Sequence, residues 1–134
     1  MRKLAVGEKA SCISVDARKS WNGTGILVHA GEKYRIDASN EEWSDAGIKS
    51  TAAGQSGRGF QRIFRPLIRC HQAQWFELVA AVGRSNQQMH PIGLGADVSF
   101  ITEENVELGF FANDVIFMYW NNKGVIHVAI TREA

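Results

Sequence analysis

Residues 125–131 read Val-Ile-His-Val-Ala-Ile-Thr, and the spacing of their large apolar side chains decides the fold class. Ile126, Val128 and Ile130 fall on every second position, with His127 and Ala129 between them. Because successive side chains of a β-strand point to opposite faces, this spacing predicts a strand with one buried face. Residues 24–29 and 33–38 have the same period, and the sequence Ala-Gly-Glu between them predicts a hairpin turn.

Short runs of the same kind recur along the rest of the chain. We expect further strands at residues 11–15, 67–71, 76–82, 97–102 and 106–112, separated by clusters of Gly, Asn, Ser and Asp. Residues 74–82 also fit helical spacing, which periodicity alone does not exclude for so short a run, and we assign a strand there. The pattern predicts an all-β protein, an antiparallel β-sandwich that forms a single domain over residues 1–134.

Composition narrows the class of function. Charged residues make up 22% of the 134-residue chain and the formal net charge is only +1, which argues against a nucleic-acid binder. The longest apolar runs are shorter than a membrane span, so we expect no membrane partner. Gly7, Glu8 and Lys9 interrupt any apolar segment after the basic start, so we expect no signal peptide. A cytoplasmic location and release by a non-classical route both stay open.

The two cysteines, Cys12 and Cys70, are too few for a disulfide framework, and we expect buried free thiols. Cys70 and His71 are neighbours on a predicted strand and would point to opposite faces, so they cannot act as nucleophile and base. No other pattern in the sequence points to catalysis. We therefore expect a binding protein rather than an enzyme.

Residues 113–124 carry the chemistry that stands out. Asp114 and the pair Asn121 and Asn122 place three oxygen-bearing side chains around one loop. Calcium takes six to eight oxygen ligands, so this set predicts a partial calcium site with positions left for a ligand's hydroxyl groups. The sequence Asn-Asn-Lys-Gly at 121–124 is also an ordinary turn signal, and the two readings stay open at this point.

The order of these features resembles the LecA-type (PA-I-like) galactophilic lectins, a bacterial family, over about residues 21–130. The resemblance rests on the runs Thr-Gly-Ile-Leu-Val at 24–28 and Tyr-Arg-Ile-Asp-Ala at 34–38, on Trp43, on Cys70-His71, and on the Asn-Asp, Asn-Asn and Gly of residues 113–124. It implies a jelly-roll-like β-sandwich similar to galactose-binding domains.

The resemblance also implies a calcium site that binds galactose. The side chains of Asp114, Asn121 and Asn122 would hold the ion with the main-chain carbonyls of Met118 and Ala46, and two sugar hydroxyls would complete its shell. Tyr119 and Trp120 would give the sugar an apolar platform beside Asp114, Asn121 and Asn122. With one carboxylate, such a site is expected to bind calcium loosely, at about 10⁻⁴ M or weaker without sugar. Ion and sugar would then bind cooperatively.

The sequence departs from the family in two places. Residues 115–120 are apolar or aromatic, and Ile63 and Pro66 fall where the family's His and Gln contact the sugar. The apolar run favours a homo-oligomer, or a metal-free β-sandwich used as an interaction or structural protein. A further alternative is an anionic glycan bound by the arginines in this part of the chain, namely Arg58, Arg62, Arg65 and Arg69.

Overall fold

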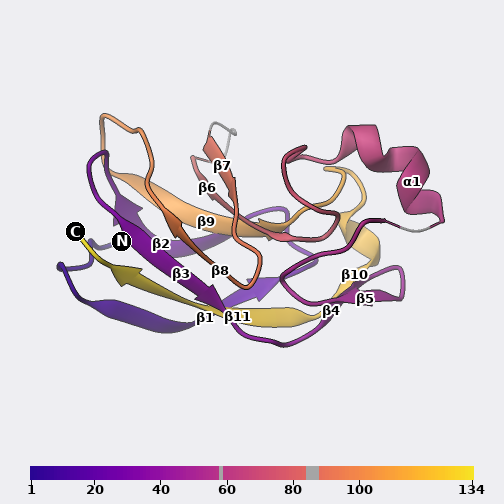
Figure 1. Ribbon diagram of the computed structural model, residues 1–134, viewed down its shortest axis with the longest axis horizontal. Helices are drawn as coiled ribbons and strands as arrows, with labels where there is room; N and C mark the ends of the chain where they lie inside the picture. The colour runs from indigo at the N-terminus through magenta and orange to yellow at the C-terminus, as the bar shows by residue number, and fades with distance from the viewer. Residues whose placement is uncertain (58, 84–87) are drawn as a thin grey trace.

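The computed structural model describes residues 1–57, 59–83 and 88–134, which fold into two antiparallel sheets packed face to face, as Figure 1 shows. The first sheet has the strand order β1 (Lys9–Asp16), β11 (Val125–Arg132), β3 (Tyr34–Ala38) and β8 (Gly95–Val98). The second has the order β2 (Asn22–Val28), β9 (Val106–Ala112), β6 (Leu78–Val82) and β7 (Gln88–Pro91). The predicted jelly-roll-like antiparallel β-sandwich is confirmed.

A third, smaller sheet lies at one end of the sandwich. It consists of β10 (Asn122–Lys123), β4 (Trp43–Asp45) and β5 (Ile48–Ser50) in that order. The helix α1 (Phe60–Phe64) and the 3₁₀ turns η1 (Arg65–Leu67) and η2 (Tyr119–Asn121) accompany it. Both chain termini lie at the opposite end of the molecule (Figure 1). Residues 113–122 therefore leave β9 and enter the end that carries the small sheet.

The alternation in residues 125–131 produces the predicted buried face. Ile126, Val128 and Ile130 are at most 2% exposed and belong to the core between the two sheets. His127 and Ala129 face outward and are half-buried. Burying each large aliphatic side chain contributes about 1.5–3 kcal/mol, so this strand is a major element of the core.

Strand β6 explains why residues 74–82 had no clear period. Every residue of Leu78–Val82 is buried. Leu78, Ala80 and Val82 face the main core, whereas Val79 and Ala81 pack in a second cluster with Phe111 under residues 70–73. A strand covered on both faces reads as a continuous apolar run rather than an alternating one.

Three local predictions are wrong. Residues 24–38 do not form a hairpin, because β2 pairs with β9 while β3 pairs with β11 and β8 in the other sheet. Residues 67–71 do not form a strand, since only Ile68 makes a single bridge, to Val115. Both cysteines are free, but only Cys70 is buried, whereas Cys12 is exposed and has a φ of 59° at a register shift of β1.

Neither α1 nor any other helix among the described residues has the length and apolar character needed to cross a membrane.

Candidate functional site

Asp114 is held rigidly below the surface where the chain leaves β9. The residue is 0% exposed, and its Oδ1 accepts a hydrogen bond from the Val115 amide at 2.7 Å. Its Oδ2 accepts one from Asn122 Nδ2 at 2.9 Å. The two bonds fix the plane of the carboxylate, and each oxygen keeps a further lone pair for another ligand.

Asn122 is equally buried and its amide has only one orientation that satisfies its neighbours. Its Nδ2 donates both to Asp114 Oδ2 and to the Ala17 carbonyl, the latter at 3.0 Å. Both hydrogens of the amide are therefore used. Its Oδ1 consequently faces the other way, toward Asn121.

Asn121 lies at the centre of a group of acceptors. Turned inward, its amide nitrogen lies 2.8 Å from the Met118 carbonyl oxygen, 3.1 Å from Asn122 Oδ1 and 3.1 Å from Asp45 Oδ1. An NH₂ group has two hydrogens, and three acceptors surround this one atom. Turning the amide by 180° would add its own oxygen to the same group. We call these four groups, Asp45 Oδ1, the Met118 carbonyl, the Asn121 amide and Asn122 Oδ1, the oxygen cluster.

Asp45 is the member of the cluster that sequence reasoning missed. It ends β4 directly opposite Asn122 of β10 and is only 1% exposed. Its Oδ2 accepts hydrogen bonds from Gln61 Nε2 and Trp75 Nε1, both at 2.8 Å. These two donors fix one oxygen of the carboxylate and leave Oδ1 directed at the cluster.

Ala46 lies at the edge of the same group. Ala46 and Gly47 form the turn between β4 and β5 with φ values of 50° and 87°. Positive φ is unfavourable for a residue with a Cβ, so Ala46 is a strained turn residue of the kind often found beside functional sites. Its amide donates to the Asn121 carbonyl at 3.1 Å, which ties this turn to residues 118–122.

Among the described residues, the carboxylates of Asp45 and Asp114 have no cationic side chain to balance their charge. The pKa of Asp114 is raised to about 6, chiefly by burial and in smaller part by the charge of Asp45, while hydrogen bonds from Asn122 and the Val115 amide oppose the shift. In the described part of the chain, no Lys, Arg or His side chain forms an ion pair with Asp45 or Asp114. The same residues contain no group of three or more His, Cys, Asp or Glu side chains suited to a metal. The donor set is thus two carboxylates with neutral amide and carbonyl oxygens, which suits a hard cation.

The structure separates the two residues predicted to form a platform. Trp120 is 70% exposed beside Asn121, as a platform requires. Tyr119 is 5% exposed, donates its hydroxyl hydrogen to the Ala112 carbonyl at 2.6 Å and accepts a bond from Arg69 at 2.9 Å. The platform role is therefore wrong for Tyr119, whose ring lies inside the protein.

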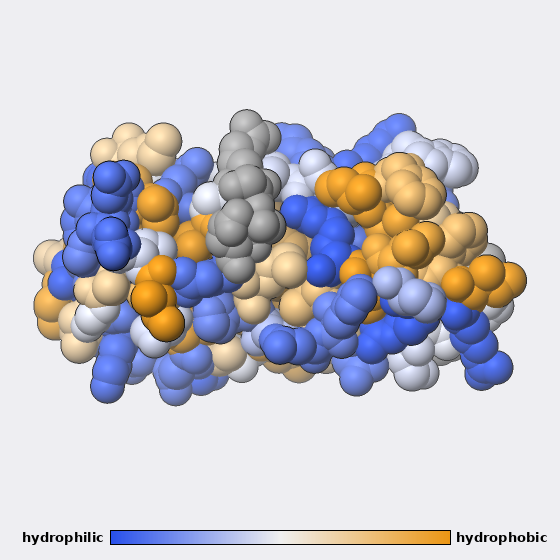
Figure 2. Space-filling model, turned by 90° about the horizontal axis from the view of Figure 1, so that it is seen from above, coloured by the Kyte–Doolittle hydropathy of each residue, from blue (hydrophilic) through white to orange (hydrophobic). Residues whose placement is uncertain are grey.

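Exposed apolar side chains gather at this end of the molecule, where Figure 2 shows hydrophobic surface around α1. They come from α1, η1, the loop before η2 and η2 itself. We call them the apolar end: Ile63, Leu67, Ile116, Phe117 and Trp120, which are 53–76% exposed. The loop residues among them do not pack beneath the loop. Ile63 and the exposed Pro66 belong to the same surface region.

The arginines do not form one basic face. Arg62 is exposed, but Arg65 donates to the Ala73 carbonyl at 3.2 Å. Arg69 donates to the Ser20 carbonyl at 2.6 Å, and its guanidinium lies 3.5 Å from the centre of the Phe111 ring. Arg58 lies outside the described residues. Two of the four arginines are thus engaged in holding the structure together.

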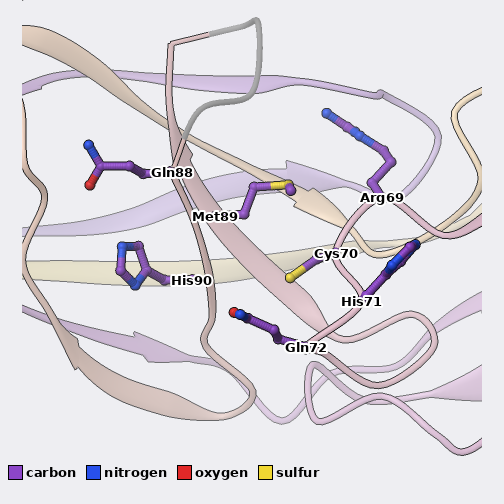
Figure 3. A pocket seen from close by; sticks show the side chains of 7 residues that line it. All are labelled: Arg69, Cys70, His71, Gln72, Gln88, Met89 and His90. Atoms are coloured by element: carbon purple, nitrogen blue, oxygen red, sulfur yellow. The ribbon is translucent and has the colours of Figure 1, made fainter.

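A separate hollow of about 470 Å³ lies over β7 and the 69–72 segment. Figure 3 shows the side chains of Cys70 and His71 at its edge pointing in different directions. Burial raises the pKa of the Cys70 thiol, which lowers its reactivity. The pair therefore lacks the arrangement of a nucleophile and its base.

Comparison with known proteins shows a likeness of fold to solved structures. No family model matches the sequence, and no curated protein matches it. Among solved structures, the chain is similar to a domain described as the N-terminal domain of EclA, a PllA-like lectin. The TM-score is 0.66 at 22% identity, and the match covers 93% of this chain and 98% of that one. At this identity the likeness establishes the β-sandwich fold.

Proposed function

We propose that this protein is a calcium-dependent, lectin-like carbohydrate-binding module and not an enzyme. The observation that carries the proposal is the oxygen cluster, in which three acceptors lie within 3.1 Å of one terminal atom of the Asn121 amide. A cation beside this amide would satisfy acceptors that a single NH₂ group serves incompletely, with Asn121 turned to present its oxygen. The likeness to a lectin domain is consistent with this proposal.

The proposed ligands of the ion are the residues that the sequence singled out. Asp114, Asn121 and Asn122 would contribute side-chain oxygens, and Met118 and Ala46 would contribute main-chain carbonyls. When bound, calcium would supply open coordination positions for two sugar hydroxyls. The protein itself excludes water from one side of the site, because Asp114 and Asn122 are 0% exposed.

We propose galactose or a related sugar as the ligand. The exposed indole of Trp120, the middle residue of η2, offers a flat apolar face with a polar N–H to one side of a sugar ring. Ile63 and Pro66 replace polar contacts of the family, so the site would select less strongly among sugars that present the same hydroxyl pair. Screening of galactose against its epimers tests this selectivity.

Thermal unfolding in EDTA, in calcium, and in calcium with galactose tests the proposal. A ligand that binds the native state at ten times its Kd stabilises it by about 1.4 kcal/mol, which is about 3–5 °C for a chain of this size. We expect a rise with calcium and a further rise with galactose. The variant Asp114→Asn should lose both rises and keep the circular dichroism spectrum of the wild type.

The matched control is Asp37→Asn, which removes an exposed carboxylate of β3 that bonds Arg35. It should keep both rises in the unfolding temperature. No rise for the wild type at millimolar calcium would refute the ion site. A rise with calcium alone would keep the ion and reject galactose.

A second candidate function rests on the apolar end. Several exposed apolar side chains in one region are typical of an interface, and we propose that a second copy of this chain covers them. Sedimentation of the wild type and of the double variant Ile63→Ser, Phe117→Ser tests this: the wild type should be oligomeric and the variant monomeric. A monomeric wild type at all concentrations would reject it.

A further inference from the structure

We infer that Asp45 is a second carboxylate ligand of the ion, so that calcium binds before the sugar and without its help. This inference rests on the proposed function and adds to it a residue and an order of binding. The ligand set implied by the sequence contains a single carboxylate and predicts that the ion and the sugar depend on each other. A second charged ligand changes that expectation.

The position of Asp45 suits this role. Pairing of β4 with β10 places it opposite Asn122, so it approaches the cluster from a strand remote in sequence. Gln61 and Trp75 both bond its Oδ2, which fixes the carboxylate in the plane that directs Oδ1 at Asn121. Donors that orient a carboxylate by binding its other oxygen are the usual support of a metal ligand.

The buried charges of Asp45 and Asp114 also support a role for Asp45 as a ligand of the ion. Asp45 and Asp114 are at most 1% exposed, and no cationic side chain of the described residues forms an ion pair with either. Buried carboxylates are normally paired or coordinate a metal, because an unpaired buried charge is costly. One divalent cation balances two carboxylates. The other ligands in the oxygen cluster are neutral amide and carbonyl oxygens. They would complete the coordination shell of the ion without adding charge.

The order of binding follows from the number of charges. Calcium affinity in oxygen sites rises with the number of charged ligands and with the rigidity of the site. Both carboxylates here are held by two hydrogen bonds each. The ion should therefore bind the sugar-free protein, and the sugar should then bind a preformed site.

Calcium titration by calorimetry, without sugar, tests the inference on wild type, Asp45→Asn, Asp114→Asn and the control Asp37→Asn. Asn at position 45 has nearly the same shape, and its oxygen can still accept from Gln61 and Trp75. We expect Asp45→Asn to weaken calcium binding about 10–100-fold, and Asp37→Asn to leave it unchanged. Terbium luminescence gives a second readout, because the Trp75 indole bonds Asp45 and would transfer energy to an ion beside it.

The unfolding temperature separates a ligand from a structural residue. In EDTA, Asp45→Asn should unfold at or above the wild-type temperature, because it removes a buried charge that no cationic side chain of the described residues pairs. In calcium it should unfold below the wild type. A structural residue would lower the temperature in both conditions. If Asp45→Asn does not fold, terbium luminescence of the wild type still tests the role, because emission sensitised by Trp75 requires an ion beside the Asp45 carboxylate that this indole bonds.

The outcomes distinguish the two claims. A wild type that binds no calcium and no terbium overturns the proposed function together with this inference. Equal calcium affinity in wild type and Asp45→Asn overturns the role of Asp45 and leaves the proposed function standing. Wild-type binding seen only when galactose is present overturns the order of binding.

Discussion

Replacement of Asn113 by Ala should destabilise the fold strongly and leave the proposed ion site chemically intact. Asn113 precedes Asp114 but faces away from the oxygen cluster. It is 0% exposed, its Oδ1 accepts from the Cys70 amide at 2.9 Å, and its Nδ2 donates to the carbonyls of Cys70 and Gln74 at 2.8 and 2.9 Å. The side chain thus fastens residues 70–74 to the end of β9.

The cost can be worked out bond by bond. The Cys70 amide loses its partner in the interior, at about 1–3 kcal/mol. The Cys70 carbonyl keeps its bond from the Ala73 amide and the Gln74 carbonyl lies nearer the surface, so each of these losses costs about 0.5–1.5 kcal/mol. The sum is about 2–6 kcal/mol, a large share of the stability of a typical domain.

Urea unfolding followed by tryptophan fluorescence measures this loss. With a slope of about 1–3 kcal/mol per molar urea, a loss of about 4 kcal/mol lowers the midpoint by more than about 1 M. The control Asn105→Ala removes an exposed amide bonded to Lys3 and should change stability by at most about 0.5 kcal/mol. A loss below about 1 kcal/mol for Asn113→Ala would refute the reasoning, as would a wild-type stability for Asn113→Asp, whose carboxylate would face two carbonyls.

Two further predictions concern stability. Gly124 has a φ of 108°, and a Cβ there would lie 2.8 Å from the Trp43 Cα, so Gly124→Ala should lose about 2–4 kcal/mol in urea unfolding. Gly25→Ala, at a φ of 75° with no atom within 4 Å of its Cβ, should lose only about 1–2 kcal/mol, and an equal loss at both positions would reject the clash. Burial would raise the pKa of Glu32, but bonds from Lys3, Tyr34 and the His29 amide outweigh it and hold the pKa below its usual 4.5. Since the folded pKa is the lower one, the stability from this carboxylate is complete above about pH 4.5 and is lost as the pH falls through the folded value. Glu32→Gln should therefore flatten the acid side of the pH–stability curve, and an unchanged acid slope would contradict this.

The sequence was most informative where one face of a strand is buried. Apolar and more polar side chains alternate in residues 125–131 because only one side of β11 faces the core. The observed strand covers the residues that this alternation predicted. The segment between β2 and β3 misled because Ala-Gly-Glu turns the chain equally well within one sheet or between two. Hydrogen-bond partners, which the sequence does not display, decide between those outcomes.

The residues of the candidate site likewise fall into those that the sequence predicted and those that it did not. Asp114, Asn121 and Asn122 stand close together in sequence, and the structure brings them together. Asp45 lies far from them along the chain and becomes their neighbour only through the pairing of β4 with β10. The burial of Tyr119 could not be predicted either. Tyr119 and Trp120 are adjacent aromatic residues, and the sequence does not indicate which of the two points inward.

The dispersed origin of the oxygen cluster limits how the site can be moved to another protein. Grafting residues 113–124 as a loop would transplant Asp114, Asn121 and Asn122 but leave behind Asp45 and the Ala17 carbonyl that orients the Asn122 amide. Such a graft would reproduce the recognisable motif without its second charge or its fixed amide. The transferable unit is the loop together with the β4–β5 hairpin and the segment at Ala17 that follows β1, not the motif alone.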